Sequence, residues 1–134
     1  MRVLLDTHIL LWCLAGEPPL PASILTVIQN ATEVHASVAS LWEIAIKHSI
    51  GKLVLDLPIE DLVAAIEKSG FEILSVKAEH AITVPTLPFL HRDPFDRMLI
   101  AQSMAEPLRL LTCDKALAPY GGTVLLCQGP RSTS

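Results

Sequence analysis

The sequence predicts an α/β sandwich built on about five parallel strands. Short apolar runs alternate with longer segments whose apolar residues recur at helical spacing, and this alternation is typical of parallel βαβ units with helices on both faces of a sheet. Hydrophobic residues make up 51% of the 134 residues and charged residues only 18%, which excludes a disordered chain. We expect residues 1–127 to form one domain and residues 128–134 a disordered tail.

The expected strands are short apolar runs that stop at polar or turn residues. The first is followed directly by Asp6, and the last begins after the turn sequence "YGG". In chain order the expected strands are Val3–Leu5, Glu33–Ala36, Glu72–Val76, Arg109–Thr112 and Thr123–Leu126.

The expected helices show apolar residues at helical spacing and end at helix-stopping residues. The first ends at "AGEPPLP", the third at Gly51 and the fourth at Gly70, and the proline-rich stretch "VPTLPFLHRDP" predicts a loop before the sixth. In chain order the helices are His8–Leu14, Ala22–Asn30, Val38–Ser49, Ile59–Lys68, Glu79–Val84 (one or two turns), Pro94–Ala105 and a short one at Lys115–Ala118.

Charge and hydropathy limit the classes of function. A net charge of −4 argues against a protein that binds polyanions by bulk charge. No run of about 18 apolar residues occurs, so we expect no transmembrane helix and no membrane partner. Asp6 and His8 interrupt the apolar N-terminal stretch, which makes it a poor export signal, and three cysteines without metal spacing read as free thiols. These features predict a cytoplasmic protein.

Acidic residues follow the expected strands in a pattern that predicts a site. Asp6 and Asp114 come directly after the first and fourth strands, and Glu43 lies in the helix that follows the second. Asp93 and Asp96 begin the helix that leads into the fourth strand. Because ligands of open parallel sheets bind beyond the carboxyl ends of the strands, these carboxylates are expected to converge on one rim.

Each acid also has a purely structural explanation. Asp6, Asp93 and Asp114 all stand where an N-cap would accept hydrogen bonds from the first turn of a helix. Glu43 could form a capping box with Ser40, or lie on a solvated helix face. Taken one at a time, these alternatives stay open.

Taken together, the acids indicate a bound cation. Two carboxylates 5 Å apart repel by about 3 kcal/mol at an effective dielectric near 20, so a cluster of them needs protons or a cation to offset the cost. Helix N-termini favour the ionised form of a carboxylate, which leaves the cation. Ligation by oxygen alone favours Mg²⁺, with Mn²⁺ as the other choice.

Four motifs carry a family resemblance. The stretches "VLLDTHILLW", "SVASLWEIAIKHSIGKL", "DPFDRMLIAQ" and "LLTCDKAL", in this order and spacing, closely resemble the PIN-domain ribonucleases, and best the VapC-type toxins of bacterial toxin–antitoxin pairs. The resemblance covers residues 1–127 and implies a three-layer sandwich whose parallel sheet has the strand order 3-2-1-4-5. It also implies Mg²⁺-dependent hydrolysis of RNA, a cognate antitoxin as partner, and a homodimer.

The resemblance also assigns site residues, position by position. The acids that bind metal and carry catalysis are Asp6, Glu43, Asp96 and Asp114. Asp93 falls on the family pattern but is assigned mainly to the helix cap. Thr7 and Thr112 either orient a carboxylate or metal-bound water, or cap the local backbone. Phosphates of RNA could be met by Arg92, Lys115 and Arg97, the last of which could instead form an ion pair on the helix surface.

Further residues near the expected rim are given structural roles. His8 and His91 are expected to be loop histidines and not catalytic groups. The aromatic side chains Trp12, Trp42 and Phe95 read as core or interface anchors.

A second class of function is the alternative. An acidic rim on an α/β domain is also found in receiver-like phospho-acceptor modules, and a non-catalytic relative could act by titrating an antitoxin. The receiver pattern needs adjacent acids after the first strand, and "VLLDT" offers one.

Overall fold

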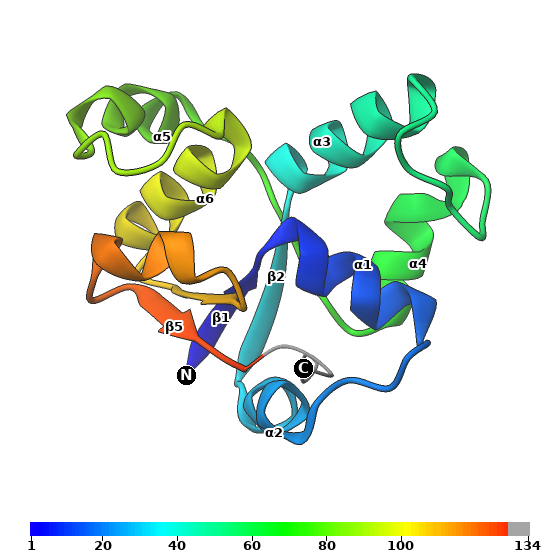
Figure 1. Cartoon of the computed structure of the whole chain (residues 1–134). Helices are drawn as coiled ribbons and strands as arrows, with labels where there is room; N and C mark the ends of the chain where they lie inside the picture. Colours follow the sequence, from blue (N-terminus) through cyan, green and yellow to red (C-terminus); the bar gives the residue numbers. More distant parts are fainter. Residues whose placement is uncertain (129–134) are drawn as a thin grey trace, which may run out of the picture.

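The computed structural model describes residues 1–128 and contains one parallel five-stranded sheet (Figure 1). The strand order is β3-β2-β1-β4-β5, as the resemblance implies. The strands are β1 (Arg2–Leu5), β2 (Glu33–Ser37), β3 (Glu72–Leu74), β4 (Arg109–Thr112) and β5 (Val124–Leu126). The predicted fold class is therefore confirmed.

Helices cover both faces of this sheet, so the domain has three layers (Figure 1). One face packs on α1, α2 and α4, and the other on α6 and the 3-10 helix η3, while α3 contributes to both cores. The helices are α1 (Thr7–Ala15), α2 (Ala22–Asn30), α3 (Val38–Ser49), η1 (Ile59–Asp61), α4 (Leu62–Lys68), α5 (Ala78–Thr83), η2 (Val84–Thr86), α6 (Pro94–Ala105) and η3 (Lys115–Tyr120).

Three predicted helices, those that became α2, α3 and α6, have the bounds expected from the sequence. The helix predicted over residues 59–68 is instead a 3-10 turn followed by α4, and the predicted loop before α6 contains the turn η2. Strand β3 stops at Leu74 and not at Val76, because Leu74 pairs with Ser37, where β2 ends. Apart from Gln128, the predicted disordered tail lies outside the described residues.

The position of β1 decides where a site can form. It lies between β2 and β4, with Leu4 opposite His35 and Leu5 opposite Leu111, so the carboxyl ends of these strands meet at one edge of the sheet. The chain leaves β1 toward α1 on one face of the sheet and leaves β4 toward η3 on the other, and ligands of open α/β sheets bind where adjacent strands diverge in this way.

A buried hydrogen bond fixes α6 against the start of α3. The hydroxyl of Ser37, the N-cap of α3, donates to Gln102 Oε1 at 2.6 Å, and both side chains are fully buried. Gln102 Nε2 also donates to the carbonyl of Ser75 at 3.3 Å. These bonds hold the C-terminal half of α6 against the N-cap of α3 and the residue that follows β3.

Within residues 1–128, no helix is long and apolar enough to cross a bilayer.

Candidate active site

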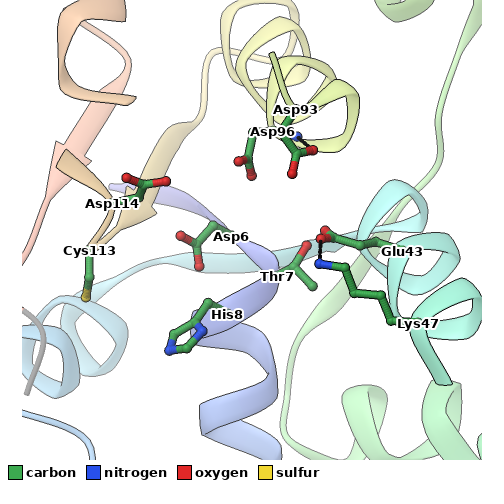
Figure 2. A pocket seen from close by; sticks show the side chains of 9 residues that line it. All are labelled: Asp6, Thr7, His8, Glu43, Lys47, Asp93, Asp96, Cys113 and Asp114. Atoms are coloured by element: carbon green, nitrogen blue, oxygen red, sulfur yellow. Dashed lines mark hydrogen bonds and ion pairs between the residues drawn. The ribbon is translucent and has the colours of Figure 1, made fainter. Parts of the chain in front are cut away.

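A pocket of about 390 Å³ opens at the carboxyl ends of β1 and β4, between α3 and α6 (Figure 2). We call it the acidic pocket, because five of the nine residues that line it are carboxylates. They are Asp6, Thr7, His8, Glu43, Lys47, Asp93, Asp96, Cys113 and Asp114. All four acids predicted to form the site, and Asp93, therefore lie together.

Asp6 both caps a helix and faces the acidic pocket. It is 5% exposed, and its Oδ1 accepts a hydrogen bond from the amide of Ile9 at 2.8 Å, at the N-terminus of α1. Its Oδ2 accepts from the hydroxyl of Thr112 at 2.5 Å. Burial raises the pKa of Asp6 above its usual value, although these hydrogen bonds oppose the rise. The two explanations considered for Asp6 are thus not exclusive.

Thr112 links the two acids that follow the strands. While its hydroxyl donates to Asp6, it also accepts from the amide of Asp114 at 3.0 Å. Asp114 in turn caps η3, since its Oδ1 accepts from the amide of Ala116 at 2.9 Å. Both roles predicted for Thr112, the orientation of a carboxylate and local capping, occur in the same side chain.

Glu43 is held by a lysine one turn further along α3. Lys47 Nζ lies 2.6 Å from Glu43 Oε2, whereas Oε1 is buried and has no hydrogen-bond partner within the described residues. The predicted capping box with Ser40 is wrong, because α3 begins at Val38 and its N-cap is Ser37. The solvated-face alternative is also wrong, because Glu43 is only 5% exposed.

Asp93 and Asp96 have different roles at the start of α6. Asp93 is the N-cap, and its Oδ1 accepts from the amides of Phe95 and Asp96 at 2.8 and 3.2 Å. Asp96 points into the acidic pocket, where its Oδ2 lies 2.9 Å from Nε2 of His91. Burial, together with the charges of Asp93 and Glu43, raises the pKa of Asp96 to about 6, although His91 opposes the rise.

These residues fit a hard divalent cation. Carboxylate oxygens are the ligands that Mg²⁺ and Mn²⁺ prefer. Glu43 Oε1 is a buried acceptor with no donor in the described part of the chain, and such a group is costly unless something binds to it. Ligand atoms of Asp96, Asp114 and His91 also lie within 4.8 Å of one another. Five acids against one lysine leave the acidic pocket short of positive charge.

Two supporting residues do not act as the sequence suggested. Arg97 is buried and donates to the backbone carbonyls of Val84 and Pro88 and to the hydroxyl of Tyr120, at 3.0 to 3.2 Å, so it neither faces the acidic pocket nor forms an ion pair on the helix surface. Its side of α6 faces the segment that precedes the helix. Thr7 lines the pocket, but its hydroxyl donates to Ser40 at 2.8 Å, so it joins α1 to α3 instead of orienting an acid or capping backbone.

The sequence did not lead us to place Lys47 in the site or to predict the bond from His91 to Asp96. Glu43 and Lys47 stand four residues apart on a predicted helix, a spacing that favours an ion pair and was visible in the sequence. The partner of His91 had no such signal, because His91 lies in a loop whose path depends on the rest of the fold. Arg92 and Lys115, the other cations considered, do not line the acidic pocket.

An apolar groove lies between α3, α5 and α6. It holds about 470 Å³ and is lined by Val38, Ala39, Trp42, Val76, Ala81, Val84, Pro94, Phe95 and Met98. Trp42 is 63% exposed and packs edge-on against Phe95, with ring centroids 5.5 Å apart. Of the aromatic anchors predicted, only Trp12 is a buried member of the core.

Comparison with known proteins decides the family. The family model described as "PIN domain" matches residues 3–122. The chain belongs to the PIN-domain family. The predicted resemblance is therefore confirmed at the level of the family, and this membership leaves no place for the receiver-like alternative. Among curated proteins, none matches the sequence significantly.

Several solved structures share the fold at low sequence identity. VapBC2 from Rickettsia felis, bound to a DNA fragment from its promoter, is 17% identical with a TM-score of 0.66, over 97% of this chain and 100% of that chain. DNA-bound VapBC from Salmonella typhimurium is 19% identical with a TM-score of 0.63, over 91% and 94%. VapBC-5 from Mycobacterium tuberculosis is 17% identical with a TM-score of 0.60, over 96% and 99%.

Proposed function

We propose that this PIN domain is a Mg²⁺-dependent ribonuclease, with Mn²⁺ as an alternative ion, that hydrolyses phosphodiester bonds of RNA. One observation carries the proposal: acids from four separate segments meet in one pocket, where Glu43 keeps a buried oxygen that has no partner among residues 1–128. A structural role accounts for three of the acids as helix caps. It does not explain Asp96, whose burial raises its pKa, or the buried oxygen of Glu43 that has no partner within the described residues.

Each acid has a distinct role in the proposal. Asp6 and Asp96 bind the cation directly, and Glu43 and Asp114 complete its oxygen ligands. When bound, the cation supplies Lewis-acid chemistry, since it stabilises the negative charge that develops on phosphate oxygens and activates water. Glu43 Oε1 is the acceptor available to orient the attacking water, because Oε2 is already occupied by Lys47. Thr112 holds Asp6 in place through its hydroxyl.

The same proposal makes the protein the toxin of a toxin–antitoxin pair. It is supported by family membership and by the shared fold with VapBC complexes. We infer a cognate antitoxin as partner, a homodimer as the assembly, and the cytoplasm as the compartment, which suits the three free thiols. The exposed Trp42 and the apolar groove around it offer a surface that a partner chain could cover.

The test of this function is cleavage of RNA by protein freed of any antitoxin. We expect cleavage with Mg²⁺ or Mn²⁺, none with EDTA, and none by Asp6→Asn, whose circular dichroism spectrum should match the wild type because Asn can still cap α1. Wild-type rates from Asp6→Asn, or cleavage that persists in EDTA, would refute the assignment.

A further inference from the structure

One basic side chain, that of Lys47, stands among the carboxylates of the acidic pocket. Among residues 1–128, Lys47 is the one lysine or arginine that lines this pocket. Arg97 is committed to the backbone of the segment before α6, and Arg92 and Lys115 lie outside the pocket. RNA that reaches the acids therefore meets five carboxylates and a single lysine.

The geometry of Lys47 leaves it able to bind a second anion. An ammonium group carries three donors, and the only hydrogen bond of Lys47 Nζ within the described residues is to Glu43 Oε2, at 2.6 Å. Its side chain is 48% exposed, whereas that of Glu43 is 7% exposed, so the lysine lies at the solvent side of the pair and the acid inside. Figure 2 shows the ammonium group of Lys47 beside the carboxylate of Glu43. The bond to Glu43 also restricts the flexible lysine stem, which lowers the entropy lost when a ligand binds.

We propose that Lys47 binds a phosphate of the RNA beside the bond that is cut, while its bond to Glu43 anchors it at the mouth of the acidic pocket. This inference rests on the proposed ribonuclease function and adds the residue that holds the substrate. It also accounts for how a site with five carboxylates accepts a polyanion, because the cation inside and Lys47 at the rim would each face a phosphate oxygen.

The test measures RNA binding without cleavage, in an Asp6→Asn background. A short single-stranded RNA is titrated at several salt concentrations, with Lys47→Met added to this background. We expect the affinity to fall by about fivefold to tenfold, and the slope of log K against log salt to decrease by about 0.7, the value for one lost phosphate contact on a single strand. Lys47→Arg should restore both. Lys52→Met is the matched control, since Lys52 is exposed just beyond α3 and outside the pocket.

A second measurement separates phosphate binding from a purely structural role. Binding of Mn²⁺ to the otherwise wild-type protein, measured by calorimetry in the absence of RNA, should not weaken in Lys47→Met. Cleavage by the same variant should show a raised KM with kcat changed much less. If Lys47→Met does not fold, Lys47→Gln takes its place in every assay.

The outcomes are distinct. Unchanged RNA affinity and salt slope in Lys47→Met would overturn the proposal, and so would a loss of Mn²⁺ affinity with an unchanged slope, because Lys47 would then only position Glu43. If the wild-type protein neither cleaves nor binds RNA with either metal, the proposed function itself is wrong.

Discussion

The two sides of the acidic pocket hold their acids in different ways. On the sheet side, Asp6 and Asp114 follow β1 and β4 and are fixed by backbone amides and by the hydroxyl of Thr112. On the helix side, Glu43 and Asp96 project from α3 and α6 and are each bonded to a basic side chain, Lys47 or His91. The sheet-side acids are therefore part of the fold, whereas the helix-side carboxylates are held, within the described residues, only by other side chains.

This difference predicts what the removal of each acid does to folding and to chemistry. Removing a sheet-side acid should damage both folding and chemistry, since the same oxygens cap helices. Removing a helix-side acid should damage chemistry and leave folding nearly unchanged or improved.

The largest expected effect is at Asp6. Both Asp6→Ala and Asp6→Asn should lower RNA cleavage on the order of 10³-fold, since several kcal/mol of charge stabilisation are lost. Only the alanine variant also loses the cap of α1, so its free energy of unfolding should be about 1–2 kcal/mol lower than that of the asparagine variant. Urea unfolding of the two variants measures this gap, and equal stabilities would contradict a capping role.

Glu43→Gln should separate chemistry from stability on the helix side. We expect cleavage to fall on the order of 10²-fold, because a neutral amide is a poorer cation ligand and hydrogen-bond acceptor. The free energy of unfolding should change by less than about 1 kcal/mol, since the ion-pair partner Lys47 is half exposed. A strongly destabilised Glu43→Gln would place this acid with the sheet side.

Asp96→Asn should stabilise the cation-free protein in a pH-dependent manner. The raised pKa of Asp96, about 6, means that the folded state binds its proton more tightly than the unfolded state does. The charged carboxylate therefore costs stability fully above pH 6, and this cost disappears as the pH falls toward 4. The variant should gain on the order of 1 kcal/mol at pH 8, after screening by solvent, and lose that gain at lower pH.

Thermal melts across this pH range check the prediction. Added Mn²⁺ provides an internal control, because it should raise the melting temperature of the wild type and have little effect on Asp96→Asn. A variant that is less stable than the wild type at pH 8 would show that the bond from His91 outweighs burial.

The smallest effect on cleavage is expected at Thr112, which joins the two sheet-side acids. Thr112→Val keeps the volume and removes the hydroxyl, so we expect a loss of about 1–2 kcal/mol in unfolding and a smaller decrease in cleavage than at any acid. Thr112→Ser should recover most of both. If valine changes neither quantity, Asp6 needs no side-chain partner to keep its position.

The sequence predicts well whatever depends on local spacing. Apolar periodicity and helix-stopping residues fixed the bounds of α2, α3 and α6, and the acids after the strands were placed at the correct edge of the sheet. Capping by Asp93 was likewise readable from the residues that follow it.

Contacts between distant segments could not be read in the same way. From the sequence, Arg97 is expected on the surface of α6. In the structure it is buried, because the segment that carries Val84 and Pro88 covers it. Strand β3 is shorter than its apolar run because its partner β2 ends at Ser37. The bond from His91 to Asp96 depends on a loop path that no periodicity encodes.

The placement of β4 beside β1 has a consequence for synthesis of the protein. Asp6 is made near the start of translation and Asp114 near its end, and the hydroxyl that orients Asp6 belongs to Thr112. A nascent chain on the ribosome therefore lacks a complete site until almost the whole domain has emerged. The ribonuclease that we propose therefore cannot attack RNA while most of its own chain is still being made.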